Sequence, residues 1–387
     1  MQNSIKIDFP SNNDVELCIN SDKRECSYHI FNPKEGNPVL VFIPGCGADL
    51  GEYSAKLCSK ITNNFNITVL YVEYFAYSSR LSSGASIEFS NVDLIKINNI
   101  IVSAGLKPED NITANIKNLS NRAKQLNKNI FIDGYLKPKN KEYQNFGLMP
   151  ALDILNAIRD AISRFDLDTN SITLMGSSYG GYLANMVSKI APGYIRLVMD
   201  NSAWATPNLA YIVGKELNQP EFQCAVAEHV IANLWTLSPW TSCPDLPNTY
   251  SNHNHEIRSF SKSQLMQMSS HGATETSYIF YHSNNDHIAP AEEKINMVKH
   301  MISLGFKYIQ MEVMTDENDI DGIFIKNLDH GMGMSLYSFF EKHYEKSMND
   351  TQGFKCKNNS IVSYSCGDVI YVFDFSSRPV NFNINYI

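Results

Sequence analysis

The sequence lacks the long apolar runs of membrane proteins. None of its apolar stretches approaches the roughly 18 to 20 residues that a helix needs to cross a bilayer. It also lacks, at its start, the positively charged segment followed by an apolar one that marks a secretory signal. We therefore expect a cytoplasmic protein without a membrane span.

Cysteine is scarce and scattered. The 387 residues include eight cysteines, and no two of them form a C-x-x-C pair. This spacing argues against a zinc site and against a disulfide framework. No glycine-rich turn has the spacing of a phosphate-binding loop. The sequence therefore predicts neither a metal nor an organic cofactor.

Positively charged residues are fewer than negatively charged ones. The chain has 32 Lys and Arg against 40 Asp and Glu, a net charge of −8. Proteins that bind nucleic acid neutralise its phosphates with positive side chains, so this balance argues against nucleic acid as a partner. Hydrophobic residues make up 43% and charged residues 19%, which is typical of a folded globular protein. The expected partner is a small-molecule substrate, and the oligomeric state stays open.

What the sequence does contain is a regular alternation of apolar strands and amphipathic helices. Residues 39–43 are apolar at every position, which indicates a central parallel strand buried on both faces. Further strands are expected at 67–72, 172–175, 197–199, 278–281 and 308–313. Helical patterns between them predict an α/β fold with a mostly parallel central sheet covered by helices on both faces.

Segments that break this alternation suggest the domain organisation. The expected parts are N-terminal antiparallel strands joining the sheet at 1–37, the α/β core at 38–200 and 277–348 with an insertion at 76–146, a cap insertion at 201–276 and a small C-terminal β extension at 349–387. All three tryptophans lie in the expected cap. They could bind a sugar ring or an acyl chain, or they could form the core of the cap itself.

A Gly176-x-Ser178-x-Gly180 motif lies between an apolar strand and an amphipathic helix. A nucleophile elbow needs such a tight strand-to-helix turn, with small flanking residues that let the backbone approach closely. The alternative is a glycine-rich turn without chemistry. In this context we favour Ser178 as a nucleophile.

A serine hydroxyl needs a base to remove its proton. His330 lies in a loop after the last expected strand of the sheet and is followed by glycine, which suits a catalytic histidine. His287 is a competitor, but it adjoins the best acid candidate.

That candidate is Asp286, which follows the strand expected at 278–281. The order Ser178, Asp286, His330 is the chain order of a hydrolase triad. Asp200, at the end of the strand expected at 197–199, is the second choice, and Asp329 is a more distant third.

The oxyanion hole should combine backbone N–H groups from the residue after the nucleophile and from a loop after an early central strand. These positions are Tyr179 and Cys46. Gly45, Gly47 and Trp204 are the expected substrate-binding residues.

These residues resemble the α/β-hydrolase superfamily over roughly residues 38–347. The string Gly176-Ser177-Ser178-Tyr179-Gly180-Gly181-Tyr182 is also similar to the branch of serine peptidases related to prolyl oligopeptidase, although few residues precede the first central strand here. A closer resemblance is to a bacterial family of unknown function encoded near flagellin-glycosylation genes, where nonulosonic acids such as pseudaminic acid are made. The strings that carry it are Glu142-Tyr143-Gln144-Asn145-Phe146-Gly147, Ala191-Pro192-Gly193-Tyr194 and Leu328-Asp329-His330-Gly331-Met332-Gly333-Met334-Ser335.

Together, these features predict a serine hydrolase with a Ser-His-Asp triad and an acyl-enzyme intermediate. The hypothesised activity is that of an esterase or deacetylase on an O-acylated sugar, and the resemblance suggests a surface or flagellar glycan as its context. One alternative is an acyltransferase that passes the acyl group to a sugar with the same triad. A second is a serine peptidase, or a non-catalytic binding protein on a hydrolase fold.

Overall fold

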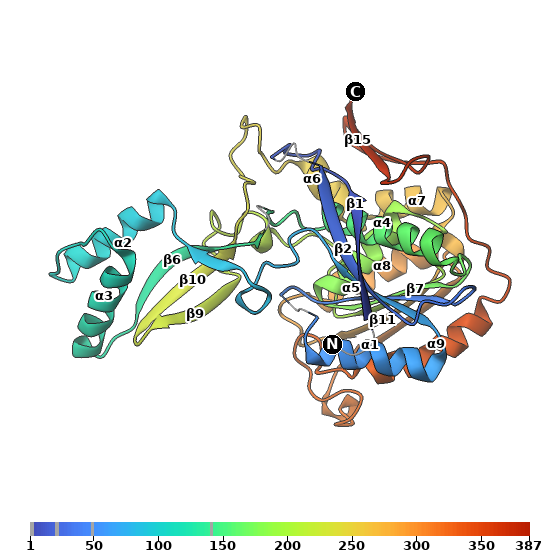
Figure 1. Ribbon diagram of the computed structural model, residues 1–387, viewed down its shortest axis with the longest axis horizontal. Helices are drawn as coiled ribbons and strands as arrows, with labels where there is room; N and C mark the ends of the chain where they lie inside the picture. Colours follow the sequence, from blue (N-terminus) through green and yellow to red (C-terminus); the bar gives the residue numbers. More distant parts are fainter. Residues whose placement is uncertain (1–3, 20–22, 48–49, 140–141) are drawn as a thin grey trace. The chain divides into compact units, whose positions relative to one another are not determined.

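The computed structural model describes residues 4–19, 23–47, 50–139 and 142–387, and the chain divides into two compact units (Figure 1). The larger one, here called the core unit, consists of Met1–Phe75, Phe146–Pro207 and Ser251–Ile387. The smaller one, the inserted unit, consists of Ala76–Asn145 and Asn208–Tyr250.

An eight-stranded sheet forms the centre of the core unit, in the spatial order β1-β2-β4-β3-β7-β8-β11-β12. β2 runs antiparallel to both of its neighbours, and the other neighbouring pairs are parallel. The strands are β1 (Ser4–Ser11), β2 (Arg24–Phe31), β3 (Val39–Ile43), β4 (Thr68–Glu73), β7 (Ile172–Ser177), β8 (Leu197–Asn201), β11 (Ser277–Ser283) and β12 (Tyr308–Met314).

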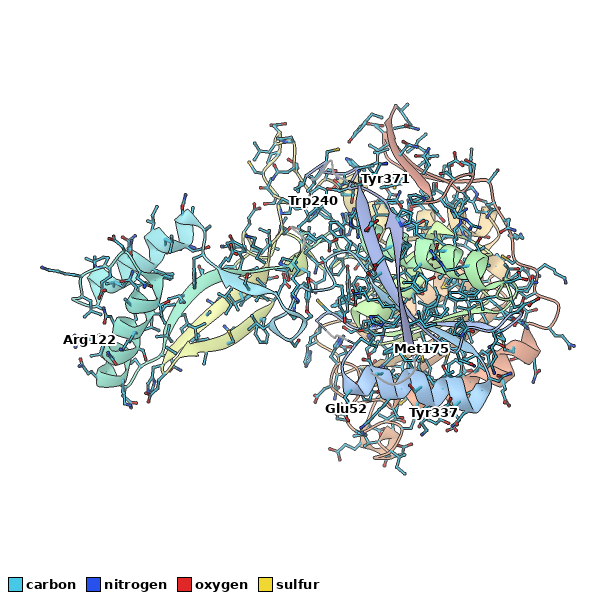
Figure 2. All side chains as sticks on the ribbon, viewed as in Figure 1. Glu52, Arg122, Met175, Trp240, Tyr337 and Tyr371 are labelled. Atoms are coloured by element: carbon cyan, nitrogen blue, oxygen red, sulfur yellow. The ribbon has the colours of Figure 1, made fainter. Side chains whose placement is uncertain are left out.

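The middle strands are buried on both faces, as the apolar sequence of residues 39–43 predicts for the first of them. All residues of β3 and of β8 are buried. Met175 of β7 is fully buried and lies among densely packed side chains (Figure 2). The strand order is that of the α/β-hydrolase fold, so the fold class expected from the sequence is confirmed.

Helices cover both faces of this sheet (Figure 1). α1 (Glu52–Phe65) and α9 (Leu336–Asp350) lie together on one face, where the rings of Phe65 and Phe340 meet edge to face at 5.0 Å. The other face carries α4 (Leu148–Phe165), α5 (Tyr179–Ile190) and α8 (Ala291–Ser303). In the part of the chain that the structure describes, no helix has the length and apolar character needed to span a bilayer.

Helix α5 is buried along its whole length, because further segments pack over its C-terminal half. Lys189 near its end donates hydrogen bonds to the carbonyl oxygens of Ile257 and Ser259, which lie at the end of α6 (Asn252–Arg258). The Tyr364 hydroxyl donates to the Lys189 carbonyl oxygen. The central helix is thereby enclosed by residues far away in the sequence.

Tyr364 belongs to a small C-terminal sheet of three antiparallel strands. They are β13 (Ile361–Cys366), β14 (Val369–Asp374) and β15 (Asn381–Tyr386). Just before β15, the Val380 carbonyl oxygen accepts from Asn12, and its N–H donates to Asn156 of α4. Segments from both ends of the sequence therefore meet on α4.

The inserted unit combines two stretches that the sequence analysis treats as separate insertions. Its sheet has the order β5-β6-β10-β9, and β6 pairs in parallel with β10 across about a hundred residues of sequence. Helices α2 and α3 pack on this sheet around buried Ile97, Leu119 and Leu234. The elements are β5 (Ser86–Glu88), α2 (Asn91–Ser103), α3 (Ile112–Leu126), β6 (Ile130–Lys137), β9 (Phe222–Ala227) and β10 (Val230–Thr236). That residues 201–276 cap the edge of the central sheet stays a prediction.

A buried carboxylate joins the antiparallel edge of the sheet to its helical layer. Asp153 of α4 is fully buried and accepts hydrogen bonds from Arg24 of β2, Ser11 of β1 and the Phe75 N–H. Because the Arg24 side chain is only 13% exposed, each charge of the pair depends on the other for compensation.

Replacing Asp153 with alanine should lower the free energy of unfolding by about 3 to 5 kcal/mol, because the Arg24 guanidinium then stays buried without its counter-charge. Denaturant unfolding followed by circular dichroism measures this change. Lys56→Ala, which removes an exposed ion pair with Glu52 on α1, should leave the unfolding midpoint nearly unchanged. Equal effects of the two substitutions would contradict the role given to Asp153.

Candidate active site

Ser178 lies at the sharp turn between β7 and α5. Its backbone has φ 56° and ψ −125°, a conformation that is costly for a residue with a side chain. A Cβ atom built on Gly176 would lie 2.2 Å from the Gly180 carbonyl carbon, and one on Gly180 would lie 2.1 Å from the Ile43 carbonyl oxygen. Only glycine fits at either position, so the G-x-S-x-G spacing has a direct steric reason here.

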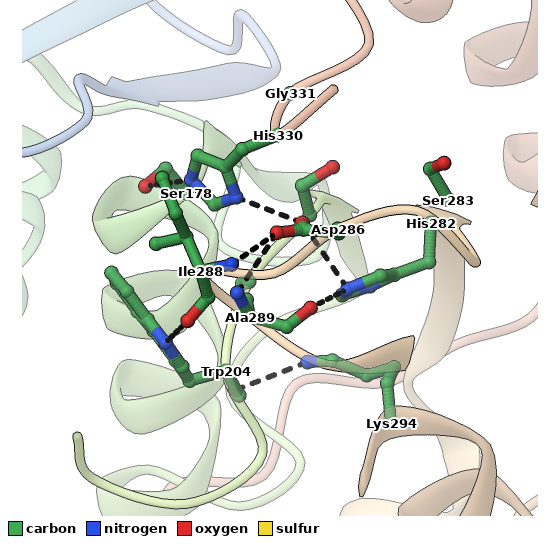
Figure 3. Close-up of polar contacts among 12 residues, drawn as sticks. Ser178, Trp204, His282, Ser283, Asp286, Ile288, Ala289, Lys294, His330 and Gly331 are labelled. Atoms are coloured by element: carbon green, nitrogen blue, oxygen red, sulfur yellow. Dashed lines mark hydrogen bonds and ion pairs between the residues drawn. The ribbon is translucent and has the colours of Figure 1, made fainter. Parts of the chain in front are cut away.

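The structure brings Ser178, His330 and Asp286 together in a hydrogen-bonded chain (Figure 3). The Nε2 atom of His330 lies 2.7 Å from Ser178 Oγ, and its Nδ1 atom lies 2.8 Å from Asp286 Oδ2. This geometry suits a neutral imidazole whose Nδ1–H donates to the carboxylate and whose Nε2 accepts from the serine hydroxyl. The His330 side chain is 18% exposed, whereas that of Asp286 is fully buried, so solvent reaches the triad from the side of the histidine.

The Asp286 carboxylate is fixed from several sides. Its Oδ1 atom accepts hydrogen bonds from the N–H groups of Ile288 and Ala289, both at 2.9 Å. Burial acts to raise the pKa of Asp286, but the hydrogen bonds from His330 and the Ala289 N–H outweigh it, so this pKa is lowered from its usual value. The carboxylate is therefore ionised at neutral pH and can orient the His330 ring.

A second histidine, His282 of β11, lies next to the Asp286 carboxylate (Figure 3). Its Nε2 atom lies 2.6 Å from the Ala289 carbonyl oxygen and 3.5 Å from Asp286 Oδ2. Burial lowers the pKa of His282, so the ring is neutral and its Nε2–H donates to that carbonyl. His282 is not among the site residues predicted from the sequence, although it stands only four positions before Asp286.

Two further residues, neither of them predicted from the sequence, hold the His330 loop. Asn201, the last residue of β8, donates to the Gly331 carbonyl oxygen at 3.1 Å and to Ser177 Oγ at 3.0 Å. Ser283, the last residue of β11, donates to the Leu328 carbonyl oxygen at 2.7 Å. Both are polar residues at the carboxyl ends of buried strands, which is the only signal that the sequence offers.

Asp200, the second choice for the acid, has different partners. It is buried, and its Oδ2 atom accepts from Lys294 of α8 at 2.8 Å and from Asn185 of α5 at 2.6 Å. This arrangement ties two helices to the end of β8. His287 and Asp329 are exposed, and the carboxylate that contacts His330 is that of Asp286.

The residues expected to surround the serine lie on two sides of it. A Cβ atom built on Gly45 would lie 3.6 Å from Ser178 Cβ, so the turn after β3, which also holds Cys46 and Gly47, passes beside the serine. Tyr179 is the first residue of α5, so its backbone N–H lies at the N-terminal end of the helix. Its buried ring packs on the ring of Phe146, with the two ring centroids 5.2 Å apart. Burial raises the pKa of Tyr179 well above its usual value.

Trp204 lies beside the histidine. Its ring centroid lies 6.0 Å from that of His330, and its Nε1–H donates to the Ile288 carbonyl oxygen at 2.8 Å (Figure 3). Only 3% of the residue is exposed. Among the described residues, no group of three or more His, Cys, Asp or Glu side chains is arranged to hold a metal ion.

Comparison with known families shows that the chain belongs to the family described as "Protein of unknown function (DUF2920)", which matches residues 5–384. No curated protein matches the chain.

Similar solved structures include the acylaminoacyl peptidase of Pyrococcus horikoshii (13% identity, TM-score 0.46, covering 93% of this chain and 43% of that one). A thermostable esterase has 13% identity and a TM-score of 0.41, with 90% of this chain and 63% of that one covered. A puromycin hydrolase has 11% identity and a TM-score of 0.47, with coverage of 91% and 40%. The chain thus spans less than two thirds of the length of these proteins.

Gly180→Ala should lower the free energy of unfolding by at least about 3 kcal/mol, because the added methyl group would collide with the backbone of β3, which has no room to move. Gly367→Ala is the control. It has a positive φ of 62° but no atom within 4 Å of the added Cβ, so it should cost only about 1 to 2 kcal/mol of backbone strain. Thermal unfolding of both variants measures the difference, and equal losses would show that close approach at the turn is not what requires glycine.

Proposed function

We propose that this protein is a serine hydrolase that cleaves a carboxylic ester through an acyl-enzyme intermediate. The observation that carries this proposal is the hydrogen-bonded chain from Ser178 Oγ through His330 to the ionised Asp286. A serine hydroxyl on a strained turn, in contact with an imidazole that a carboxylate orients, is the arrangement that activates serine for attack on an acyl carbon.

In the proposed mechanism, Ser178 Oγ attacks the ester carbonyl carbon while His330 Nε2 takes the hydroxyl proton. The proton then passes from His330 to the leaving alcohol, and the acyl group stays on the serine. Water, deprotonated by the same nitrogen, attacks the acyl-enzyme and releases the acid. Asp286 remains ionised and stabilises the imidazolium that forms at each step.

The negative charge of the tetrahedral intermediates would be stabilised by backbone donors. We assign this role to the N–H of Tyr179, at the positive end of α5, and to the N–H of Cys46. Gly45 supports the assignment, because its lack of a side chain lets the Cys46 turn pass close to the serine.

The proposed substrate is an O-acylated sugar, with the enzyme acting as an esterase or deacetylase. We assign contact with the sugar to the small exposed part of Trp204, whose ring centroid lies 6.0 Å from that of His330, because aromatic rings pack well on sugar rings. The resemblance to a family encoded near flagellin-glycosylation genes suggests a surface or flagellar glycan as the source. Acyl transfer to a sugar would use the same residues, and analysis of the products with a sugar acceptor present separates the two reactions.

The first test uses a fluorophosphonate probe, which labels activated serines, together with hydrolysis of p-nitrophenyl acetate. The wild-type protein should be labelled and should hydrolyse the ester. Ser178→Ala should lose labelling and should lower turnover by about 10⁴-fold or more. Ser303→Ala is a matched control, because Ser303 is exposed at the C-terminal end of α8, where its Oγ donates to the His300 carbonyl oxygen, and it should keep both activities. If folded wild-type protein is neither labelled nor active, the proposed hydrolase function is wrong.

A second test distinguishes the two buried aspartates. Asp286→Asn should lower kcat by roughly 10⁴-fold, because an amide at this position favours the wrong tautomer of His330. Asp200→Asn should lower stability, since Lys294 loses its counter-charge, but the folded fraction should keep its turnover within about tenfold. Steady-state kinetics corrected for folded protein gives both values, and the reverse pattern would transfer the role to Asp200.

A further inference from the structure

A second pocket of the core unit lies between α4 and the C-terminal segment. Its volume is about 380 Å³, within the range of small-molecule sites. Arg159 of α4, Lys357 and Arg378 line it together with Tyr194. None of its lining residues belongs to the site around Ser178.

The charges that line this pocket all have one sign. Its lining contains two arginines and one lysine and no carboxylate. Within the described residues, none of these three cations forms an ion pair. Asp168, a neighbour in sequence of the lining residue Thr169, does not line the pocket, and its Oδ1 atom accepts a hydrogen bond from the Asn170 N–H. In a chain of net charge −8, three uncompensated cations in one pocket favour an anionic ligand.

Hydrogen bonds to the backbone hold the Arg159 side chain in place. The Arg159 guanidinium donates to the carbonyl oxygens of Phe375 and Ser377, both at 2.8 Å. Burial lowers the pKa of Arg159, and the positive charge of Arg378 adds to this effect. A bound anion would relieve the repulsion between these two arginines.

The Lys357 side chain packs against the backbone of two glycines, Gly193 and Gly272. A Cβ atom built on Gly272 would lie 2.5 Å from Lys357 Nζ, and one on Gly193 would lie 3.1 Å from its Cδ atom. The Lys357 N–H also donates to the Gly193 carbonyl oxygen at 2.9 Å. The absence of side chains at both glycines makes room for the lysine, so its position depends on the local backbone as well as on its own rotamers.

We propose that this pocket binds a small organic phosphate monoester. The three cations would hold the phosphate oxygens, and guanidinium groups are well suited to this because their donors match phosphate geometry. Burial raises the pKa of Tyr194 to about 12, so its hydroxyl is neutral and able to donate. The cavity is larger than a phosphate group, and Ile162, Ala191 and Phe375 give it an apolar wall for the organic part. This proposal does not depend on the proposed hydrolase function.

Isothermal titration calorimetry with two phosphate monoesters, glucose 6-phosphate and AMP, tests the proposal. Glucose, adenosine and inorganic phosphate serve as the matching partial ligands. At least one monoester should bind the wild-type protein more tightly than its dephosphorylated counterpart and than inorganic phosphate. If neither does so, or if inorganic phosphate binds as tightly, the proposal is wrong.

Substitutions locate the site. Lys357→Gln combined with Arg378→Gln removes two exposed cations of the pocket and should weaken binding at least about tenfold. The control combines Lys262→Gln with Lys346→Gln, which changes the net charge equally at exposed positions outside the pocket and should leave the affinity unchanged. Equal weakening by both pairs would mean that the anion senses overall charge, and it would overturn the assignment. Circular dichroism of each variant confirms that it is folded.

Discussion

The backbone of Gly180 passes so close to the carbonyl oxygen of Ile43 that a single methyl group would not fit between them. This contact joins the end of β3 to the start of α5, and the geometry of the candidate active site depends on it. It brings the turn after β3, which holds Cys46, beside the turn at Ser178. It also restrains the serine in a backbone conformation that would relax in a looser turn.

The residues around this contact follow from local sequence, which is why they could be predicted. An apolar strand, a glycine-flanked serine and an amphipathic helix together specify a tight turn before any tertiary contact is known. His330 could be predicted in the same way, because it lies in a glycine-containing loop after the last strand of the sheet. The acid was harder to choose, because Asp200 and Asp286 both follow buried strands. What separates them is Lys294, which reaches Asp200 from a helix almost a hundred residues away.

The parts that sequence reasoning missed depend on pairing between distant segments. β6 and β10 are neighbours in one sheet, but their apolar patterns fit separate insertions equally well, since periodicity does not identify a partner strand. Asn201 and Ser283 are similar cases. Each looks like an ordinary polar residue at the end of a strand, and its role appears only when the His330 loop is placed against it.

The junction of Asn12, Asn156 and Val380 has a consequence for biosynthesis. Because Asn156 lies on α4 and its partner is located more than two hundred residues later, the layer of helices on this face cannot be completed while the C-terminal sheet is still inside the ribosome. The same holds for α5, whose Lys189 carbonyl is bonded by Tyr364. A nascent chain that has emerged only as far as α9 would thus expose the apolar surface that this sheet covers. Such an intermediate is a natural client for chaperones that bind exposed apolar segments during translation.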